Sequence, residues 1–413
     1  MPASVNKLRP IIIAVISLMF FISASGFFLS LPGALGGHVD FRTFYTVGYM
    51  ARTGHGSEIY DPAEYQRFQN RLVGPVEGLL PFNHLTYESL LYVPFSFFSY
   101  RTAYLLFVGT NLLILSAAAM LFRLLVAKLS EIWWHLPLAI MASFLPVSMA
   151  LIEGQDSLLL LLLFVAATAA WYRQNDFTAG LLLGLSLFKF QYAIPVAVLM
   201  IVWRRWRLLR GFFLSGAVVL AISIWIAGLS GSAQFVHSVL EVSARYSSSN
   251  GVLYGVHPDG MPNIRGLTYM LTGGSVFAGH WITLIFSAMV MAWEALKRPS
   301  LPGALLAALL VSYHQVIADS SLLLLPAGWI LAGNITDLGL RRSRISVLIA
   351  CLALVCPTVL LFANTRFYLL VFPVAGLFLL WDPPPSPIIL HDPVSASSIG
   401  DRELGQGPSG RFV

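Results

Sequence analysis

Apolar runs long enough to cross a lipid bilayer recur along most of this chain of 413 residues. A helix needs about 20 predominantly apolar residues to span the hydrocarbon core. The runs cover residues 11–31, 102–126, 132–151, 156–172, 177–188, 191–203, 211–230, 277–296, 301–313, 319–333, 344–362 and 367–381. Because a helix satisfies its own backbone hydrogen bonds in lipid, they predict an all-α, polytopic transmembrane fold with about 10–12 spans. The shorter runs indicate tilted, broken or re-entrant helices.

The composition excludes an ordinary soluble protein. Hydrophobic residues make up 57% of the chain and charged residues only 11%, whereas a soluble domain carries roughly 25% charged residues. The net charge of +6 is explained by the membrane topology below, so we expect membrane lipids and no nucleic acid as partners. The two cysteines, Cys351 and Cys356, lie in one apolar run and predict neither a disulfide framework nor a metal site.

The first apolar run has two possible interpretations. Lys7 and Arg9 precede it, as in a secretory signal peptide, and Ser23-Ala24-Ser25 resembles a cleavage site. The run continues apolar beyond that point and is long enough to span the membrane. We therefore favour an uncleaved anchor.

Basic residues are concentrated in alternate loops between the runs, which orients the chain. If the N-terminus is cytoplasmic, the inside loops contain Arg123, Lys128, Arg173, Arg204, Arg205, Arg207, Arg210, Lys297, Arg298, Arg341, Arg342 and Arg344. Cytoplasmic loops carry an excess of Lys and Arg. The pattern therefore predicts that both termini are cytoplasmic, as in a multi-pass protein of a bacterial inner membrane.

This topology also predicts the domain organisation. Residues 1–381 form a single transmembrane catalytic domain, with two long outside loops at about 33–101 and 231–276 that contain interfacial helices. Residues 382–413 are rich in Pro, Gly and Ser and predict a disordered cytoplasmic tail. The sequence contains no nucleotide-binding glycine motif, P-loop or HExxH motif. Any chemistry must therefore use the outside loops and the outer ends of helices.

Polar residues that are unusual for a membrane protein collect on the outside under this topology. Charged residues at membrane depth are expensive and are usually functional or paired. Those found at four separate outside turns are Asp40, Arg42, Glu153, Gln155, Asp156, Lys189, Gln191, His314 and Asp319. Together they predict an active site at the membrane surface that faces the periplasm or the exterior.

Two of these residues suggest definite roles, each with an alternative. A carboxylate at Asp40 could act as a general base on a sugar hydroxyl, or it could cap a following interfacial helix. The ammonium of Lys189 could hold a phosphate, or it could be a snorkelling lysine with its charge in the interface. The short apolar runs on both sides of Lys189 favour a role in a buried cavity.

The remaining candidates are less specific. His314 could donate a hydrogen bond to a phosphate, and Arg265 in the second outside loop could clamp one. Tyr45 belongs to a set of aromatic residues that either stack on sugars or sit in the interfacial belt. The segment Glu153 to Asp156 could bind a divalent cation, but tight turns between helices collect the same residues. We therefore expect no metal and no cofactor.

The order of these segments resembles glycosyltransferase family 87, whose members resemble mannosyltransferases that depend on polyprenol-phosphate sugars. The similar segments are Asp40 to Tyr45, Tyr60 to Pro62, Gly154 to Leu163, Ala179 to Phe190 with Pro195 behind it, Asn263 to Leu267, and Ser312 to His314 followed by Asp319 and Leu322 to Pro326. The resemblance extends from about residue 10 to 380. It implies a C-type glycosyltransferase fold whose site faces away from the cytoplasm.

The resemblance also implies an activity. The enzyme would be an inverting hexosyltransferase that moves a sugar, with mannose as the first candidate, from a polyprenyl-phosphate donor to a lipid or glycan acceptor. Asp40 matches the proposed base of the family, and His314 matches a residue expected near the donor phosphate. Lys189 and Arg265 would bind that phosphate as well. The other residues implied in substrate binding are Arg42, Tyr45, Gln155, Asp156, Gln191, Asn263 and Asp319.

Two residues differ from the family pattern, which leaves the donor sugar and the acceptor undetermined, and two other functions are also compatible with the sequence. Asp156 stands where family members often have a small polar residue, and Gln315 follows His314 where they often have a second histidine. The main alternative is a transporter or flippase for a lipid-linked or small anionic substrate, which broken helices would also suit. A non-catalytic membrane scaffold is a third interpretation.

Overall fold

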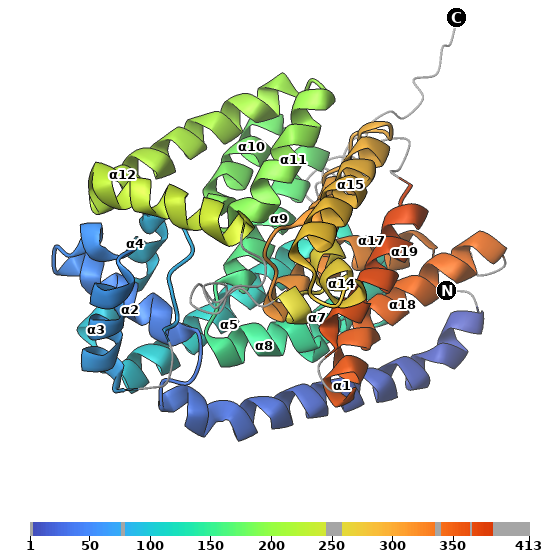
Figure 1. Cartoon of the computed structure of the whole chain (residues 1–413). Coiled ribbons are helices and arrows are strands. Elements are labelled where there is room, and N and C mark those ends of the chain that lie inside the picture. The colour runs from blue at the N-terminus through green and yellow to red at the C-terminus, as the bar shows by residue number, and fades with distance from the viewer. Residues whose placement is uncertain (1–2, 76–78, 245–257, 335–339, 364–365, 383–413) are drawn as a thin grey trace, which may run out of the picture.

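The fold is built from helices that follow the apolar runs closely. A computed structural model describes residues 3–75, 79–244, 258–334, 340–363 and 366–382, and within these ranges no residue lies in a strand. The predicted disordered tail at 382–413 lies outside the described residues except for Asp382. Figure 1 shows α1 along one edge of the helical bundle and α12 along the opposite edge.

The elements follow one another in a simple order. They are α1 (Ala3–Leu35), α2 (Phe41–Arg52), η1 (Gly56–Glu58), α3 (Pro62–Val73), η2 (Thr86–Glu88), α4 (Ser89–Tyr92), η3 (Phe95–Phe97), α5 (Tyr100–Leu125), α6 (Ala127–Ile132), α7 (Leu136–Ser143), α8 (Leu145–Glu153), α9 (Ser157–Tyr172), α10 (Asp176–Leu185), η4 (Ser186–Lys189), α11 (Phe190–Val202), α12 (Trp206–Ala244), η5 (Pro258–Gly260), α14 (Ile264–Leu271), α15 (Val276–Ala295), α16 (Leu301–Val311), η6 (Ile317–Leu323), α17 (Leu324–Asn334), α18 (Arg341–Phe362), η8 (Phe367–Leu370) and α19 (Val371–Leu380).

The helices have the length and composition of a multi-pass membrane protein, and the predicted all-α polytopic fold is confirmed. Five described helical segments are long and apolar enough to cross a membrane, and the bent pair α7–α8 makes a sixth. Three shorter apolar helices, 157–172, 301–311 and 367–380, add to these. The figure of 10–12 spans stays a prediction, because it also requires the short helices to cross.

The segment 176–202, counted above as one of the five, consists of α10 and α11 joined by the 3₁₀ turn η4, and it folds back on itself. Its two ends meet, because Nη1 of Arg205, just beyond α11, lies 3.9 Å from Oδ2 of Asp176 at the start of α10. A straight helix rises about 1.5 Å per residue, so an unbroken helix of this length would hold these ends far apart. The turn lies at Lys189, whose backbone is non-helical (φ −110°, ψ 63°). The two short predicted helices are therefore an antiparallel pair with Lys189 at the turn.

The first helix packs on the bent pair that follows it in the bundle. The axes of α7 and α8 differ by 57°. The Ser23 hydroxyl donates a hydrogen bond to the Ser143 carbonyl (3.3 Å), and the Ser148 hydroxyl donates to the Ser23 carbonyl (3.0 Å). Ser23 belongs to the segment that resembles a cleavage site, so this segment is integrated into the bundle of the described chain.

The predicted outside loops contain helices of their own. The first loop folds into α2, α3, α4 and short 3₁₀ turns, which enclose a second apolar core around Phe41 and Tyr65. In the second, α12 continues to Ala244 past the point where the sequence predicted a loop. The chain bends instead at Gly228, whose φ of 67° is readily adopted by glycine.

The basic loops follow the ends of helices that contact one another at the other end of α11 from Lys189. Trp203, at the other end of α11, donates from Nε1 to the carbonyl of Ala295 at 3.1 Å. The Lys297 ammonium donates to the carbonyl of Phe378 at 2.8 Å. Lys189 and the basic loops therefore lie at opposite ends of the same helices, as the positive-inside pattern requires.

We expect labelling to distinguish these two ends. In a variant whose own cysteines are replaced (Cys351→Ala, Cys356→Ala), Ser57→Cys should react with a membrane-impermeant maleimide added to intact cells, and Lys128→Cys should react only after permeabilisation. Both positions are exposed, so accessibility depends on the side of the membrane. Labelling of Lys128→Cys alone in intact cells would place the Asp40 side in the cytoplasm.

Candidate active site

A buried lysine joins three distant parts of the chain. The Lys189 ammonium lies 2.9 Å from Oδ1 of Asp156 and forms a second ion pair with Asp319. It also donates to Oγ of Ser157 at 3.0 Å and to Oε1 of Gln155 at 3.2 Å. All three ion-pair partners are at most 2% exposed. The ammonium is therefore not a snorkelling group, because its charge is compensated inside the protein.

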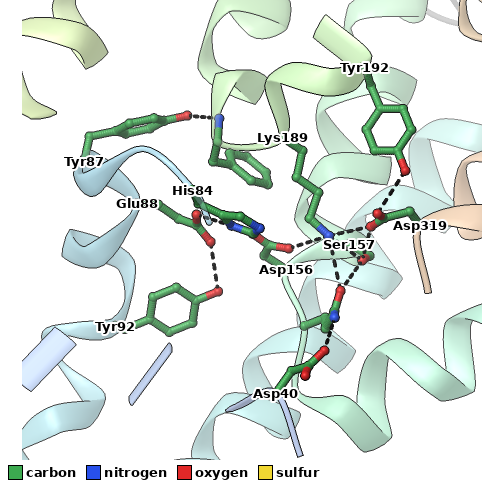
Figure 2. A network of polar contacts seen from close by, with 12 residues as sticks. Asp40, His84, Tyr87, Glu88, Tyr92, Asp156, Ser157, Lys189, Tyr192 and Asp319 are labelled. Atoms are coloured by element: carbon green, nitrogen blue, oxygen red, sulfur yellow. Dashed lines mark hydrogen bonds and ion pairs between the residues drawn. The ribbon is translucent and has the colours of Figure 1, made fainter. Parts of the chain in front are cut away.

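Asp40 is connected to this network through Gln155 (Figure 2). Gln155 donates from Nε2 to Oδ2 of Asp40 and accepts at Oε1 from Lys189. Asp40 stands at the N-cap position of α2, but its side chain makes no cap hydrogen bond there. Its carboxylate is thus used toward the network and not as a helix cap. Burial raises the pKa of Asp40, and the hydrogen bond from Gln155 opposes that rise.

The sharp turn before Gln155 is what brings these groups together. Gly154 ends α8 in the left-handed region (φ 61°), and a Cβ there would lie 2.6 Å from Cβ of Phe41. Asn111 on α5 donates to the Gln155 carbonyl at 3.0 Å. Oε2 of Glu153 accepts from the backbone N–H of Asp40 at 3.2 Å. The turn is therefore held from both sides against the start of α2.

Two further carboxyl contacts complete the network. Asp319, from η6, accepts from Oγ of Ser157 at Oδ1 (2.7 Å) and from the Tyr192 hydroxyl at Oδ2 (2.9 Å). Burial raises the pKa of Asp156, but the Lys189 ammonium, the Glu88 carboxyl and His84 together outweigh it and lower that pKa to about 2. The ammonium is thus held between two buried aspartates.

A cavity of about 240 Å³ opens beside this network. Its lining includes six of the site residues predicted from the sequence: Asp40, Gln155, Lys189, Gln191, His314 and Asp319. Burial lowers the pKa of His314 to about 4, and Nδ1 of this ring has no hydrogen-bond partner among the described residues. A neutral imidazole is therefore presented to the cavity beside a carboxylate and an ammonium.

Four predicted residues lie in supporting positions instead. The Arg42 guanidinium donates to Oδ1 of Asn70 at 2.9 Å, and the Tyr45 hydroxyl donates to the carbonyl of Phe98 at 2.8 Å. The side chain of Asn263 caps α14 and donates to the carbonyl of Ser312 at 2.8 Å.

Arg265 is the fourth. Its Nη1 donates to the carbonyl of Tyr313, next to His314. None of the four lines the cavity described above. Arg265 and Asn263 instead hold the turn that carries His314.

Several residues of the site were not found from the sequence. Ser157 and Tyr192 are ordinary residues in membrane helices. Thr43 lies in α2 and lines the cavity, but a threonine near a helix start is equally ordinary. His84 and Glu88 were signalled only by their spacing, since residues four apart face the same side of a helical turn. Burial lowers the pKa of His84 to about 4 and, with the nearby Asp156 carboxylate, raises that of Glu88 well above its usual value.

A comparison with models of protein families identifies the family of this chain. The model of glycosyltransferase family 87 matches residues 88–326, more than half of the chain. This chain belongs to glycosyltransferase family 87. No curated protein and no solved structure matches it. Family 87 membership makes the protein a glycosyltransferase with a sugar donor and an acceptor as substrates. The matched segment contains Lys189, His314 and Asp319, whereas Asp40 and His84 precede it.

The Gly154 turn generates a prediction about stability. A side chain at φ 61° is strained, which costs about 1–3 kcal/mol, and the contact with Phe41 adds to this. Gly154→Ala should therefore lower the melting temperature in detergent and reduce sugar transfer. Gly109→Ala on α5 is the matched control, because a Cβ there meets nothing within 4 Å. Equal melting temperatures for the two variants would contradict the role of this turn.

Proposed function

We propose that the protein is an inverting glycosyltransferase that uses a polyprenyl-phosphate sugar, with mannose as the first candidate. The acceptor is a lipid or glycan at the face of the membrane away from the cytoplasm, in a bacterial inner membrane. The observation that supports this most is the link Asp40–Gln155–Lys189 beside one cavity. In this proposal the Asp40 carboxylate accepts the proton, and the Lys189 ammonium is the cation that attracts the leaving phosphate.

The reaction needs one base and one phosphate binder. The acceptor hydroxyl oxygen attacks the anomeric carbon from the face opposite the phosphate, and its proton passes to the Asp40 carboxylate. Gln155 occupies Oδ2 of Asp40, which leaves Oδ1 to take the proton. The bond between the anomeric carbon and the phosphate oxygen breaks, and its electron pair leaves with polyprenyl phosphate. The anomeric configuration is therefore inverted.

The leaving phosphate requires a positive or hydrogen-bonding surface and no added proton. Lys189 and His314 line the same cavity, and fixed groups aimed at developing charge are the most effective form of stabilisation. Arg265 supports this surface by holding the Tyr313 carbonyl. Gln191, which also lines the cavity, is proposed to contact the sugar.

An apolar groove on the same side suits a lipid donor. It has a volume of about 650 Å³ and is lined by residues of α11 and of both arms of the bent α12. Phe235 and Val239 belong both to this groove and to a smaller pocket that reaches His314. A polyprenyl chain in the groove would therefore have its phosphate near the polar cavity.

The sequence alone also allowed a transporter or flippase, and one assay separates transport from the proposed transfer. Purified protein in liposomes is given a radiolabelled polyprenyl-phosphate sugar together with candidate lipid acceptors. A transferase releases polyprenyl phosphate and labels the acceptor. A flippase moves the donor between leaflets without breaking the sugar–phosphate bond.

Lys189 should be needed for donor use. Lys189→Met removes the cation, and we expect a loss of transfer of roughly 10²–10³-fold, as for removal of one preorganised group. Lys189→Arg, which keeps the charge, should lose less. Lys297→Met is the matched control, because Lys297 also pairs with a buried carboxylate (Glu294, 3.2 Å) but at the opposite end of the helices. Equal losses in Lys189→Met and Lys297→Met would show a structural role only.

Asp40 should be needed for the chemical step. Asp40→Asn keeps the shape but cannot take a proton, and transfer should fall by about 10²–10⁴-fold while polyprenyl phosphate still binds. Asp61→Asn is the control, since the Asp61 side chain caps α3 by accepting from the N–H groups of Ala63 and Glu64 and Asn is an equally good cap. Near-normal turnover of Asp40→Asn at saturating substrate would exclude Asp40 as the base.

A further inference from the structure

A second polar cluster lies behind the cavity, on the other side of Asp156 from the Lys189–Asp319 pair. Nδ1 of His84 and carboxylate oxygens of Glu88 and Asp156 all lie within 4.8 Å of one another. Nδ1 of His84 is 2.5 Å from Oε2 of Glu88 and 3.6 Å from Oδ2 of Asp156. Figure 2 shows the three side chains turned toward one another. The two segments that supply them are far apart in the sequence.

The oxygens of this cluster are poorly satisfied by the protein itself. Asp156 is 2% exposed, and no hydrogen bond of good geometry reaches its Oδ2, although Nδ1 of His84 lies 3.6 Å away and the Glu88 carboxyl lies beside it. Glu88 is fully buried, and its Oε1 accepts a long hydrogen bond from the Tyr92 hydroxyl at 3.4 Å. Buried carboxylate oxygens without donors are costly, so they are normally paired or coordinate a metal. Asp156 and Glu88 are therefore two buried carboxyl groups that face each other beside the His84 ring.

The net charge of the network also favours a bound cation. Two buried aspartates, Asp156 and Asp319, share the single charge of one described ammonium, that of Lys189. A donor phosphate would add further negative charge beside the same group. An additional positive charge near Asp156 would compensate for this excess.

We propose that His84, Glu88 and Asp156 bind a divalent transition-metal cation such as Mn²⁺ or Zn²⁺. One imidazole nitrogen and two carboxylate oxygens are a mixed ligand set that suits these ions better than an all-oxygen site would. Three protein ligands leave at least one position for water or substrate, which is typical of a catalytic metal site. His84 also lines the cavity that holds Asp40 and Lys189, so the ion has a path to the site.

The cation would act through Asp156. Once that carboxylate binds the metal, its attraction for Lys189 weakens, and the ammonium is available to the donor phosphate. This last step depends on the proposed transferase reaction, whereas the metal site depends only on the geometry of the cluster. The sequence did not reveal the site because its third ligand, Asp156, comes from a different outside turn than His84 and Glu88.

Metal binding can be tested without any activity measurement. Purified protein is treated with a chelator, dialysed and titrated with Mn²⁺, and free Mn²⁺ is followed by electron paramagnetic resonance. We expect one bound Mn²⁺ per chain, displaced by Zn²⁺. His84→Ala and Glu88→Gln should weaken binding by more than about 100-fold, because loss of even an outer-sphere partner costs about 10–100-fold.

The chain provides a matched control for these variants. His55 and Glu58 also form a histidine–glutamate contact, at 3.2 Å, but both side chains are 40% exposed and no third ligand joins them within the described residues. His55→Ala and Glu58→Gln should bind Mn²⁺ like the parent protein. Asp40→Asn should also bind Mn²⁺ while it loses transfer, which separates failure of the metal site from failure of the proposed reaction.

Two measurements on the unaltered protein cover the case in which a variant fails to fold. Mn²⁺ should raise the melting temperature of the parent protein, because an ion that binds only the folded state stabilises it. Pulsed electron paramagnetic resonance should detect a histidine nitrogen bound to the Mn²⁺. If neither Mn²⁺ nor Zn²⁺ binds, a proton held by Glu88 explains the cluster and the proposal is wrong. Unchanged binding in His84→Ala or Glu88→Gln would overturn it equally.

Discussion

The buried ammonium of Lys189 is the interaction on which the site depends. Removing one partner of a buried ion pair typically costs about 3–5 kcal/mol, because the remaining charge is left without compensation. Here Lys189 comes from the turn between α10 and α11, Asp156 from the turn between α8 and α9, and Asp319 from η6. The three segments therefore have to approach one another for any of these charges to be buried.

That requirement explains why so many helices on this side are short or broken. A polar turn can enter the membrane region only where protein or a cavity surrounds it. The break at Lys189, the left-handed turn at Gly154 and the 3₁₀ segment 317–323 all occur where a charged side chain enters the network. Each break exposes backbone groups, and the network provides the partners and the packing that compensate for them.

The fold could be predicted from the sequence more fully than the site. Apolar runs and basic loops located most of the membrane helices and the turn at Lys189, because each segment has to cross the lipid by itself. They did not show that α12 continues to Ala244. The ion pairs of the site could not be predicted in this way. Lys189 and Asp319 are 130 residues apart, and no local sequence pattern indicates which carboxylate pairs with which cation. For the same reason Ser157, Tyr192 and His84 were missed. The sequence also did not show that Arg265 donates to the Tyr313 carbonyl, and its contact with phosphate stays a prediction.

The position of Gln155 connects the two halves of the proposed reaction. Its amide donates to Asp40 and accepts from Lys189, so neither charged group is free to pair directly with the other across the cavity. An Asp40–Lys189 ion pair would lower the basicity of the carboxylate and occupy the ammonium. Separation by a neutral amide leaves a carboxylate that can accept a proton and a cation that can attract phosphate. This spacing suits a reaction whose two ends have to be held at a defined distance from each other.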